Sequence, residues 1–342
     1  MTTIPENDPG LEERLEDVTT DEAHRLRNGV ITLVVLGAML VALLLAVPGL
    51  RGVADRIGRI DGGWLTVAIL LELASCVGYA LAFQLVFRRA PLRLATRIAF
   101  AEMAFGAVLP VGGAGGIAVG AWIAKAKGGS LRRFMQRSAV LFLLTSAINA
   151  LTLAVVGLLA FVGVLHVRHP LLLGLLPGAI AVGGIVLFLA VPPVARRFGT
   201  ADDDRRGVRW LHSTAGVVRD TVTELRAPRW RLIGAVAYLW CDIAVLWACF
   251  RAFGAAPPLG ALVLAYQLGY LTNIIPIPGG IGVLDGGVTA ALILYGIPAG
   301  SAAAAVIVYH GLVLWIPTLL GTIAFLRLRS TLHEPLRLRP ES

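Results

Sequence analysis

Long apolar stretches separated by short polar segments make up most of this chain. Six of them approach or exceed the roughly 20 residues that a helix needs to cross a bilayer. They cover residues 30–49, 64–87, 138–164, 170–194, 231–253 and 300–326. The pattern predicts an all-α integral membrane protein with six full transmembrane helices.

Two further apolar regions, 98–124 and 259–296, are interrupted by proline and glycine. The interruptions read Leu-Pro-Val-Gly-Gly-Ala-Gly-Gly at 109–116 and Ile-Pro-Ile-Pro-Gly-Gly-Ile-Gly at 275–282. Proline lacks the backbone donor, and glycine loses the most conformational freedom in a helix. The piece before the first interruption would be only about 18 Å long, against a hydrocarbon core of about 30 Å. We therefore expect two re-entrant helical hairpins in addition to the six spans.

Composition and charge support a membrane location and set an orientation. Hydrophobic residues make up 57% of the 342 residues and charged residues 15%, whereas soluble domains carry about 25% charged residues. The net charge of +9 comes from basic residues clustered between apolar stretches, which argues against a nucleic-acid partner. If both termini are cytoplasmic, 25 of the 30 Lys and Arg residues lie on the cytoplasmic side. The positive-inside rule thus predicts a multi-pass cell-membrane protein with cytoplasmic N- and C-termini.

The two halves of the chain share an order of features. Residues 64–164 and 231–326 each contain a helix with one acid, a proline linker, a hairpin and a long helix. The spacing from Pro91 to Pro110 is 19 residues, as is the spacing from Pro257 to Pro276. Flanking charge places the first hairpin on the cytoplasmic side and the second on the outer side, so we expect inverted repeats. The alternative is a chance likeness between apolar stretches that contain proline and glycine.

The remaining segments are polar. We expect a disordered cytoplasmic N-terminus at 1–29, a cytoplasmic loop at 196–230 and a cytoplasmic tail at 327–342. The three cysteines lie inside apolar stretches without metal-binding spacing, so they are interpreted as packing residues and no metal or cofactor is expected.

Two motifs resemble a known family. They are Pro-Ile-Pro-Gly-Gly-Ile-Gly-Val-Leu-Asp-Gly at 276–286, and the glycine-rich stretch 109–116 followed by Ala-Lys-Ala-Lys-Gly at 124–128. The sequence is similar over 30–326 to the flippase-like transmembrane region of lysylphosphatidylglycerol synthases of the multiple peptide resistance factor type. The family often has an acid after its first glycines, where this chain has Gly116 and Ile117. The resemblance implies movement of an aminoacylated or glycosylated lipid between leaflets, without the synthase domain.

The glycine-rich interruptions are the first candidate substrate-binding elements. Exposed backbone amides in such turns can bind a lipid phosphate. The alternative is close helix packing, since Gly112, Gly116 and Gly120 are four residues apart, as are Gly282 and Gly286. The candidate residues are Pro110, Gly112, Gly113, Gly115, Gly116, Pro276, Pro278, Gly279, Gly280 and Gly282.

Four acids inside apolar stretches are the second set of candidates. An ionisable residue in the membrane is costly unless paired or hydrated, and it is therefore a functional candidate by default. Glu102 and Asp285 rank first because they adjoin the hairpins, and Glu72 and Asp242 rank second because they hold matching places in the two halves. The alternative is a structural ion pair or a neutral, hydrogen-bonded carboxyl group.

Other polar residues near the hairpins are secondary candidates. Lys125 and Lys127 are suited to anionic head groups, or serve only as topology signals. Asn273 is a secondary site candidate. For it and for Gln267, Tyr266, Tyr270, Tyr309 and His310, hydrogen bonding between helices is the expected role.

Three function classes follow. The leading hypothesis is translocation of a lipid or lipid-linked substrate, such as an aminoacylated phospholipid or a polyprenyl-linked sugar. The second is a non-transporting membrane partner of cell-envelope lipid or glycan synthesis enzymes. An intramembrane enzyme comes third, because no Ser/His/Asp set and no His-Glu-x-x-His motif supports it.

Overall fold

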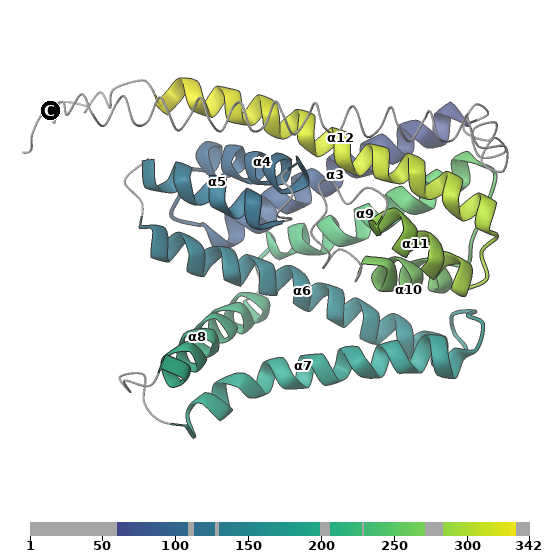
Figure 1. Ribbon diagram of the computed structural model, residues 1–342, viewed down its shortest axis with the longest axis horizontal. Helices are drawn as coiled ribbons and strands as arrows, with labels where there is room; N and C mark the ends of the chain where they lie inside the picture. Colours follow the sequence, from purple (N-terminus) through teal and green to yellow (C-terminus); the bar gives the residue numbers. More distant parts are fainter. Residues whose placement is uncertain are drawn as a thin grey trace, which may run out of the picture.

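The computed structural model describes residues 60–108, 113–126, 130–198, 206–227, 229–270 and 283–332. Every regular element in these ranges is a helix (Figure 1). They are α3 (Gly62–Val86), α4 (Leu92–Val108), α5 (Gly113–Ala126), α6 (Leu131–Phe161), the π-helical η1 (Pro170–Leu175), α7 (Leu176–Ala195), α8 (Arg206–Arg226), α9 (Leu232–Ala252), α10 (Leu259–Gly269), α11 (Val283–Leu294) and α12 (Ala299–Leu332).

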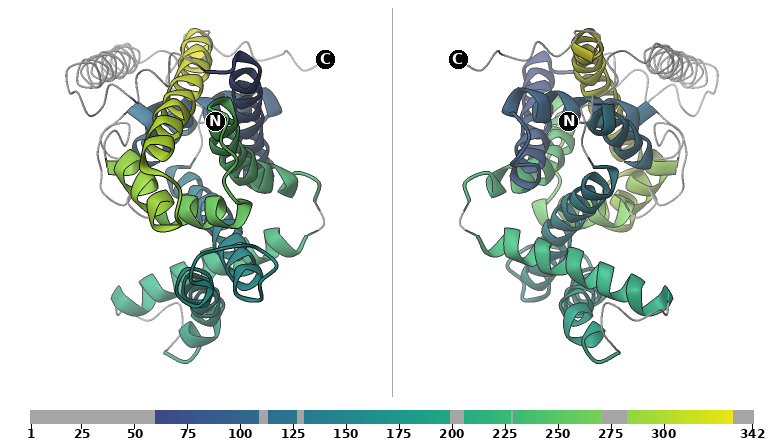
Figure 2. Two further views of the ribbon diagram at one scale, coloured as in Figure 1. Left: turned by 90° about the vertical axis from the view of Figure 1, so that its right-hand side faces the viewer. Right: turned by 90° about the vertical axis from the view of Figure 1, so that its left-hand side faces the viewer.

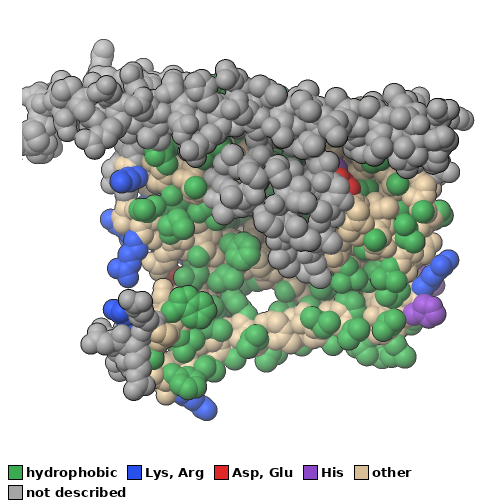
Figure 3. Space-filling view, in the orientation of Figure 1, with side chains coloured by type: hydrophobic (Ala, Val, Ile, Leu, Met, Phe, Trp, Pro, Cys, Tyr) green, Lys and Arg blue, Asp and Glu red, His purple; other side chains and the backbone are tan. Residues whose placement is uncertain are grey.

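Five helical segments are long and apolar enough to cross a membrane: α3, α6, η1 with α7, α9 and α12. They coincide with five of the six predicted spans, and the sixth, 30–49, lies outside the described residues. Large apolar side chains such as Leu70, Phe142 and Leu187 are exposed along them. Figure 3 shows this green surface, which is what a bundle surrounded by lipid tails requires.

The two interrupted regions each form a pair of short helices. Helix α4 ends at Val108 and α5 begins at Gly113, and the two helices pack against each other. Helices α10 and α11 pack together in the same way, on either side of 270–282. The pairs lie at opposite ends of the bundle (Figure 1). This arrangement fits hairpins entering from opposite sides, and whether their tips stop inside a bilayer stays a prediction.

The most extensive helix contact joins α3 to α9, which the sequence places at matching positions of the two halves. The helices are antiparallel, since the Asp61 amide donates to the Ala252 carbonyl (3.0 Å) while Gly78 meets Gly234 at the other end. A Cβ added at Gly78 would lie 2.7 Å from the Tyr238 nitrogen. Helices at such a distance need glycine, and their opposite directions are what an inverted repeat requires.

Figure 2 shows the bundle from its two ends, and the contacts between the halves follow an exchanged pattern. Helix α4 of the first half packs against α12, the last helix of the second half. Helix α10 of the second half packs against α6, the last helix of the first half. Each half therefore completes the other, since α4 and α10, which precede the two interruptions, each pack against the last helix of the opposite half.

The predicted loop 196–230 contains a structured helix, α8, which the sequence analysis did not anticipate. It packs on α6 and α7 through Ala215, Val218 and Thr221, which are buried, and leaves Trp210 exposed. Glu224 near its end forms ion pairs with Arg229 (2.6 Å) and with Arg88, the latter from the connection between α3 and α4. Lys and Arg side chains gather at this end of the molecule in Figure 3.

Candidate functional site: a buried cluster of acids and tyrosines

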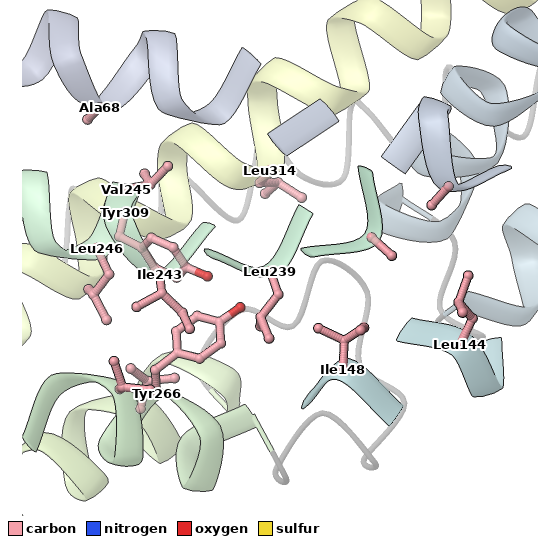
Figure 4. Packing of buried hydrophobic residues seen from close by; sticks show 14 of the residues in the cluster. Ala68, Leu144, Ile148, Leu239, Ile243, Val245, Leu246, Tyr266, Tyr309 and Leu314 are labelled. Carbon is pink, nitrogen blue, oxygen red and sulfur yellow. The ribbon is translucent and has the colours of Figure 1, made fainter. Parts of the chain in front are cut away.

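Asp242 lies in the middle of α9 and is 8% exposed. Its Oδ2 accepts hydrogen bonds from the hydroxyl groups of Tyr266 on α10 and Tyr309 on α12, the latter at 3.1 Å. Figure 4 shows these two tyrosine rings, from different helices, with their hydroxyl groups in the same space beside α9. The Tyr270 oxygen lies 3.4 Å from the Tyr309 oxygen and extends the network toward the end of α10. One carboxyl group therefore joins three helices.

Glu72 approaches this network from α3. It is 3% exposed, its Oε1 accepts from the Cys76 thiol (3.6 Å), and its Oε2 has no hydrogen-bond partner. Glu72 and Asp242 lie close enough to interact electrostatically. The two secondary candidates at matching positions of the halves are thus brought together by the antiparallel packing of α3 and α9.

Glu102 on α4 is 4% exposed and accepts a hydrogen bond from the Tyr79 hydroxyl (3.2 Å), whereas its Oε1 has no partner. The Tyr79 ring packs against that of Tyr238, with centroids 5.3 Å apart. Tyr238 is one helical turn before Asp242, so Glu102 is connected to the other two acids through aromatic rings.

We call the resulting group the acid–tyrosine cluster. Its members are Glu72, Glu102, Asp242, Tyr79, Tyr238, Tyr266, Tyr270 and Tyr309. Among the described residues no Lys or Arg forms an ion pair with any of its three acids. Buried carboxyl groups without a basic partner are expensive, so packing alone does not explain them.

Gly116 and Gly120 of α5 pack directly on Glu102. A Cβ added at Gly116 would lie 2.3 Å from the Glu102 carbonyl oxygen, and one at Gly120 would lie 2.0 Å from Oε1. Close helix packing is therefore the role that the geometry gives these two glycines. Gly286 differs, since no described atom lies within 4 Å of a Cβ added there.

The glycine-rich motif at 109–116 is partly helical, because α5 begins at Gly113. Gly113, Gly115 and Gly116 lie in the first turn of α5, where Gly116 meets the Glu102 backbone of α4. Lys125 is exposed in the last turn of α5. The other candidates lie outside the described residues: Pro110, Gly112, Lys127, Asn273, Pro276, Pro278, Gly279, Gly280 and Gly282.

Asp285 lies in the first turn of α11, where its Oδ1 is 2.7 Å from Nδ1 of His310 on α12. His310 follows Tyr309 along α12, so the pair joins α11 to a helix that contributes to the cluster. The sequence analysis named both residues, and expected His310 to bond between helices, but it did not pair them because they belong to different helices. No group of three metal-binding side chains occurs in the part of the chain that the structure describes.

Several members of the cluster were missed or given a smaller role from the sequence. The interhelical hydrogen bonds expected of Tyr266, Tyr309 and Gln267 are confirmed, the last donating to the Asn149 carbonyl (3.4 Å). Tyr79 and Tyr238 were not considered. The spacing of Tyr238 from Asp242, four residues on one helix face, is a signal that points to a shared polar surface.

These helices and their buried polar centre define a multi-pass α-helical membrane protein. A sequence model of the family described as "Lysylphosphatidylglycerol synthase TM region" matches residues 30–321, and the chain belongs to this family. The resemblance found in the two motifs is thereby confirmed. A UPF0104 membrane protein of Methanothermobacter thermautotrophicus (strain Delta H) is 35% identical over 88 residues. That match covers 25% of this chain and 25% of the relative's length.

Proposed function

We propose that this protein moves a lipid or a lipid-linked substrate from one membrane leaflet to the other. The observation that carries the proposal is the acid–tyrosine cluster, which is buried in the bundle and receives residues from both halves. The membership in a family defined by the transmembrane region of lysylphosphatidylglycerol synthases supports it. Aminoacylated phospholipids and polyprenyl-linked sugars are the candidate substrates.

The physical problem in lipid translocation is the head group. Its polar groups lose water in the hydrocarbon core, at a cost of several kcal/mol unless hydrogen bonds replace that water. Carboxyl and tyrosine hydroxyl groups can supply such bonds, whereas the acyl tails can remain in lipid. The cluster takes Glu102 from α4 and Tyr266 from α10, and the helix pairs to which they belong lie at opposite ends of the bundle (Figure 1). Movement of either pair would then expose the cluster toward its own side of the membrane.

The test is leaflet exchange in liposomes that contain the purified protein. Labelled aminoacylated phosphatidylglycerol and a labelled polyprenyl-linked sugar are the probes. Asp242→Asn keeps nearly the same volume but removes the ionisable carboxyl group, and it should slow exchange at least tenfold. Ser138→Ala is the matched control, because Ser138 is buried in α6 outside the cluster, and exchange should persist. If the wild-type protein moves neither probe faster than empty liposomes, the proposal fails.

The scaffold hypothesis is the second candidate, supported by α8 with Trp210 70% exposed at the basic end. Asp242→Asn and a variant of α8 separate the scaffold hypothesis from translocation in cells. A scaffold would keep its cellular function in Asp242→Asn and lose it in Trp210→Ala combined with Arg209→Gln, which alters only the outer face of α8. The opposite result supports translocation.

A further inference from the structure

An apolar groove of about 650 Å³ lies on the side of the bundle, between α6, α9 and α10. Its walls include Leu151, Val155, Trp240, Trp247, Leu259 and Leu262. Leu151, Val155 and Leu259 are about half exposed, so the groove opens sideways, where lipid tails surround the protein. It is separate from the acid–tyrosine cluster, none of whose members lines it.

One end of the groove carries a basic residue held by two tryptophans. The Arg251 guanidinium carbon is 5.7 Å from the centroid of the Trp247 ring and 5.2 Å from that of Trp64. The two rings meet edge to face at 5.3 Å. Trp247 therefore belongs both to the wall of the groove and to the surroundings of Arg251.

Arg251 retains hydrogen-bonding capacity at this position. Its side chain is partly exposed although Nε is buried, and no acid among the described residues forms an ion pair with it. Asp61 is the acid at the neighbouring start of α3. Its Oδ1 is engaged in capping that helix, accepting from the Gly63 amide (2.8 Å) and the Trp64 amide (3.1 Å).

We propose that an anionic phospholipid binds here, with its phosphate on Arg251 and an acyl tail in the groove. Guanidinium groups match phosphate oxygens in geometry and charge, and tryptophan favours the level of the head groups. The order of Arg251, Trp247 and Trp240 along α9 fits a lipid whose head group lies at the membrane surface and whose tail extends toward the membrane centre. Arg251 is in the last turn, Trp247 is one turn deeper, and Trp240 is about 16 Å from Arg251 along the helix.

Arg251 is near the end of α9, at the end of the bundle opposite α8, so the site faces the outer leaflet in the predicted orientation (Figure 1). Its purpose rests on the proposed function: it would be the place where the translocated lipid is released or loaded. Binding itself does not depend on transport, and the two can be measured separately.

The experiment measures quenching of tryptophan fluorescence by brominated lipids in vesicles. Brominated phosphatidylglycerol is the anionic probe and brominated phosphatidylcholine the neutral one. The wild-type protein should bind the anionic lipid about fivefold more strongly, as expected for one basic residue at a membrane surface. Trp247→Phe should remove most of the lipid-selective quenching, which locates the signal.

Arg251→Gln should bring the ratio of anionic to neutral lipid binding close to one. Arg168→Gln is the matched control, since Arg168 is an exposed arginine at the same end that contacts Gly296 and does not line the groove. Ala244→Phe adds a ring inside the groove while keeping Arg251, and it should weaken the quenching by both lipids.

The proposed site would be wrong if Arg251→Gln kept the preference for the anionic lipid, or if Arg168→Gln lost that preference to the same extent. A preference for the anionic lipid without leaflet exchange in liposomes would support the site and contradict the proposed function. Leaflet exchange without that preference would support the function and contradict the site.

Discussion

At the residue scale, the notable side chains are buried carboxyl groups that lack basic partners in the described structure. Asp242 is compensated by tyrosine hydroxyl groups, whereas one oxygen each of Glu72 and Glu102 has no hydrogen-bond partner. Such groups lower stability, and proteins retain them where function requires them. Glu224 is the contrast, since it is equally buried but paired with two arginines.

This contrast predicts opposite effects of the same substitution. Glu72→Gln keeps the shape of the side chain and removes a buried carboxyl group that lies beside Asp242 without a basic partner, so we expect a free energy of unfolding that is unchanged or raised by about 1 kcal/mol. Glu224→Gln breaks its ion pairs and should lower stability, by less than about 1 kcal/mol because both arginines are partly exposed. Thermal unfolding in detergent measures both. A large loss of stability in Glu72→Gln would show that the carboxyl group has a structural role.

At the element scale, glycine determines how closely the helices meet. Helix α3 approaches α9 at Gly78 and Gly234, and α5 approaches α4 at Gly116 and Gly120. The first contact brings Glu72 beside Asp242, and the second places Glu102 against the α5 backbone. The helix contacts therefore position the acids.

Gly78→Leu should separate α3 from α9, because even its Cβ would overlap the α9 backbone. We expect a loss of up to about 3 kcal/mol of stability, the usual limit for overpacking, together with loss of leaflet exchange. Gly183→Leu on α7 is the matched control, since nothing lies within 4 Å of the added Cβ. Thermal unfolding followed by size-exclusion chromatography measures the difference. Equal stability of the two variants would contradict the packing described here.

At the scale of the whole molecule, the two halves are arranged around the α3–α9 contact with their short helix pairs at opposite ends. The positive-inside rule predicts that the basic end, with α8 and the start of α4, is cytoplasmic. The ends of the two helix pairs then lie on opposite sides of the membrane. This arrangement underlies the proposal that the cluster opens to one side at a time.

Cysteine labelling tests the arrangement in a variant without Cys76, Cys241 and Cys249. Ser213→Cys on α8 and Lys125→Cys at the end of α5 should react with a polar thiol reagent from the cytoplasm. His166→Cys after α6 and Leu294→Cys at the end of α11 should react from outside. All four positions are exposed. Reaction of Lys125→Cys and Leu294→Cys from the same side would mean that the two helix pairs do not enter from opposite sides.

The sequence alone determined the class of protein, because bilayer thickness sets helix length and hydrocarbon excludes unpaired backbone groups. It predicted the five described spans to within a few residues at most ends, although α6 begins about two turns before the predicted start. It also predicted that the helices break near Pro110 and Pro276. It also identified the acids, since charge stands out in an apolar stretch.

Tertiary structure decided which acids meet, because partners such as Asp285 and His310 lie on different helices, and no periodicity within one helix encodes such contacts. It also showed that Gly116 and Gly120 serve packing, and that a presumed loop holds α8 against the bundle.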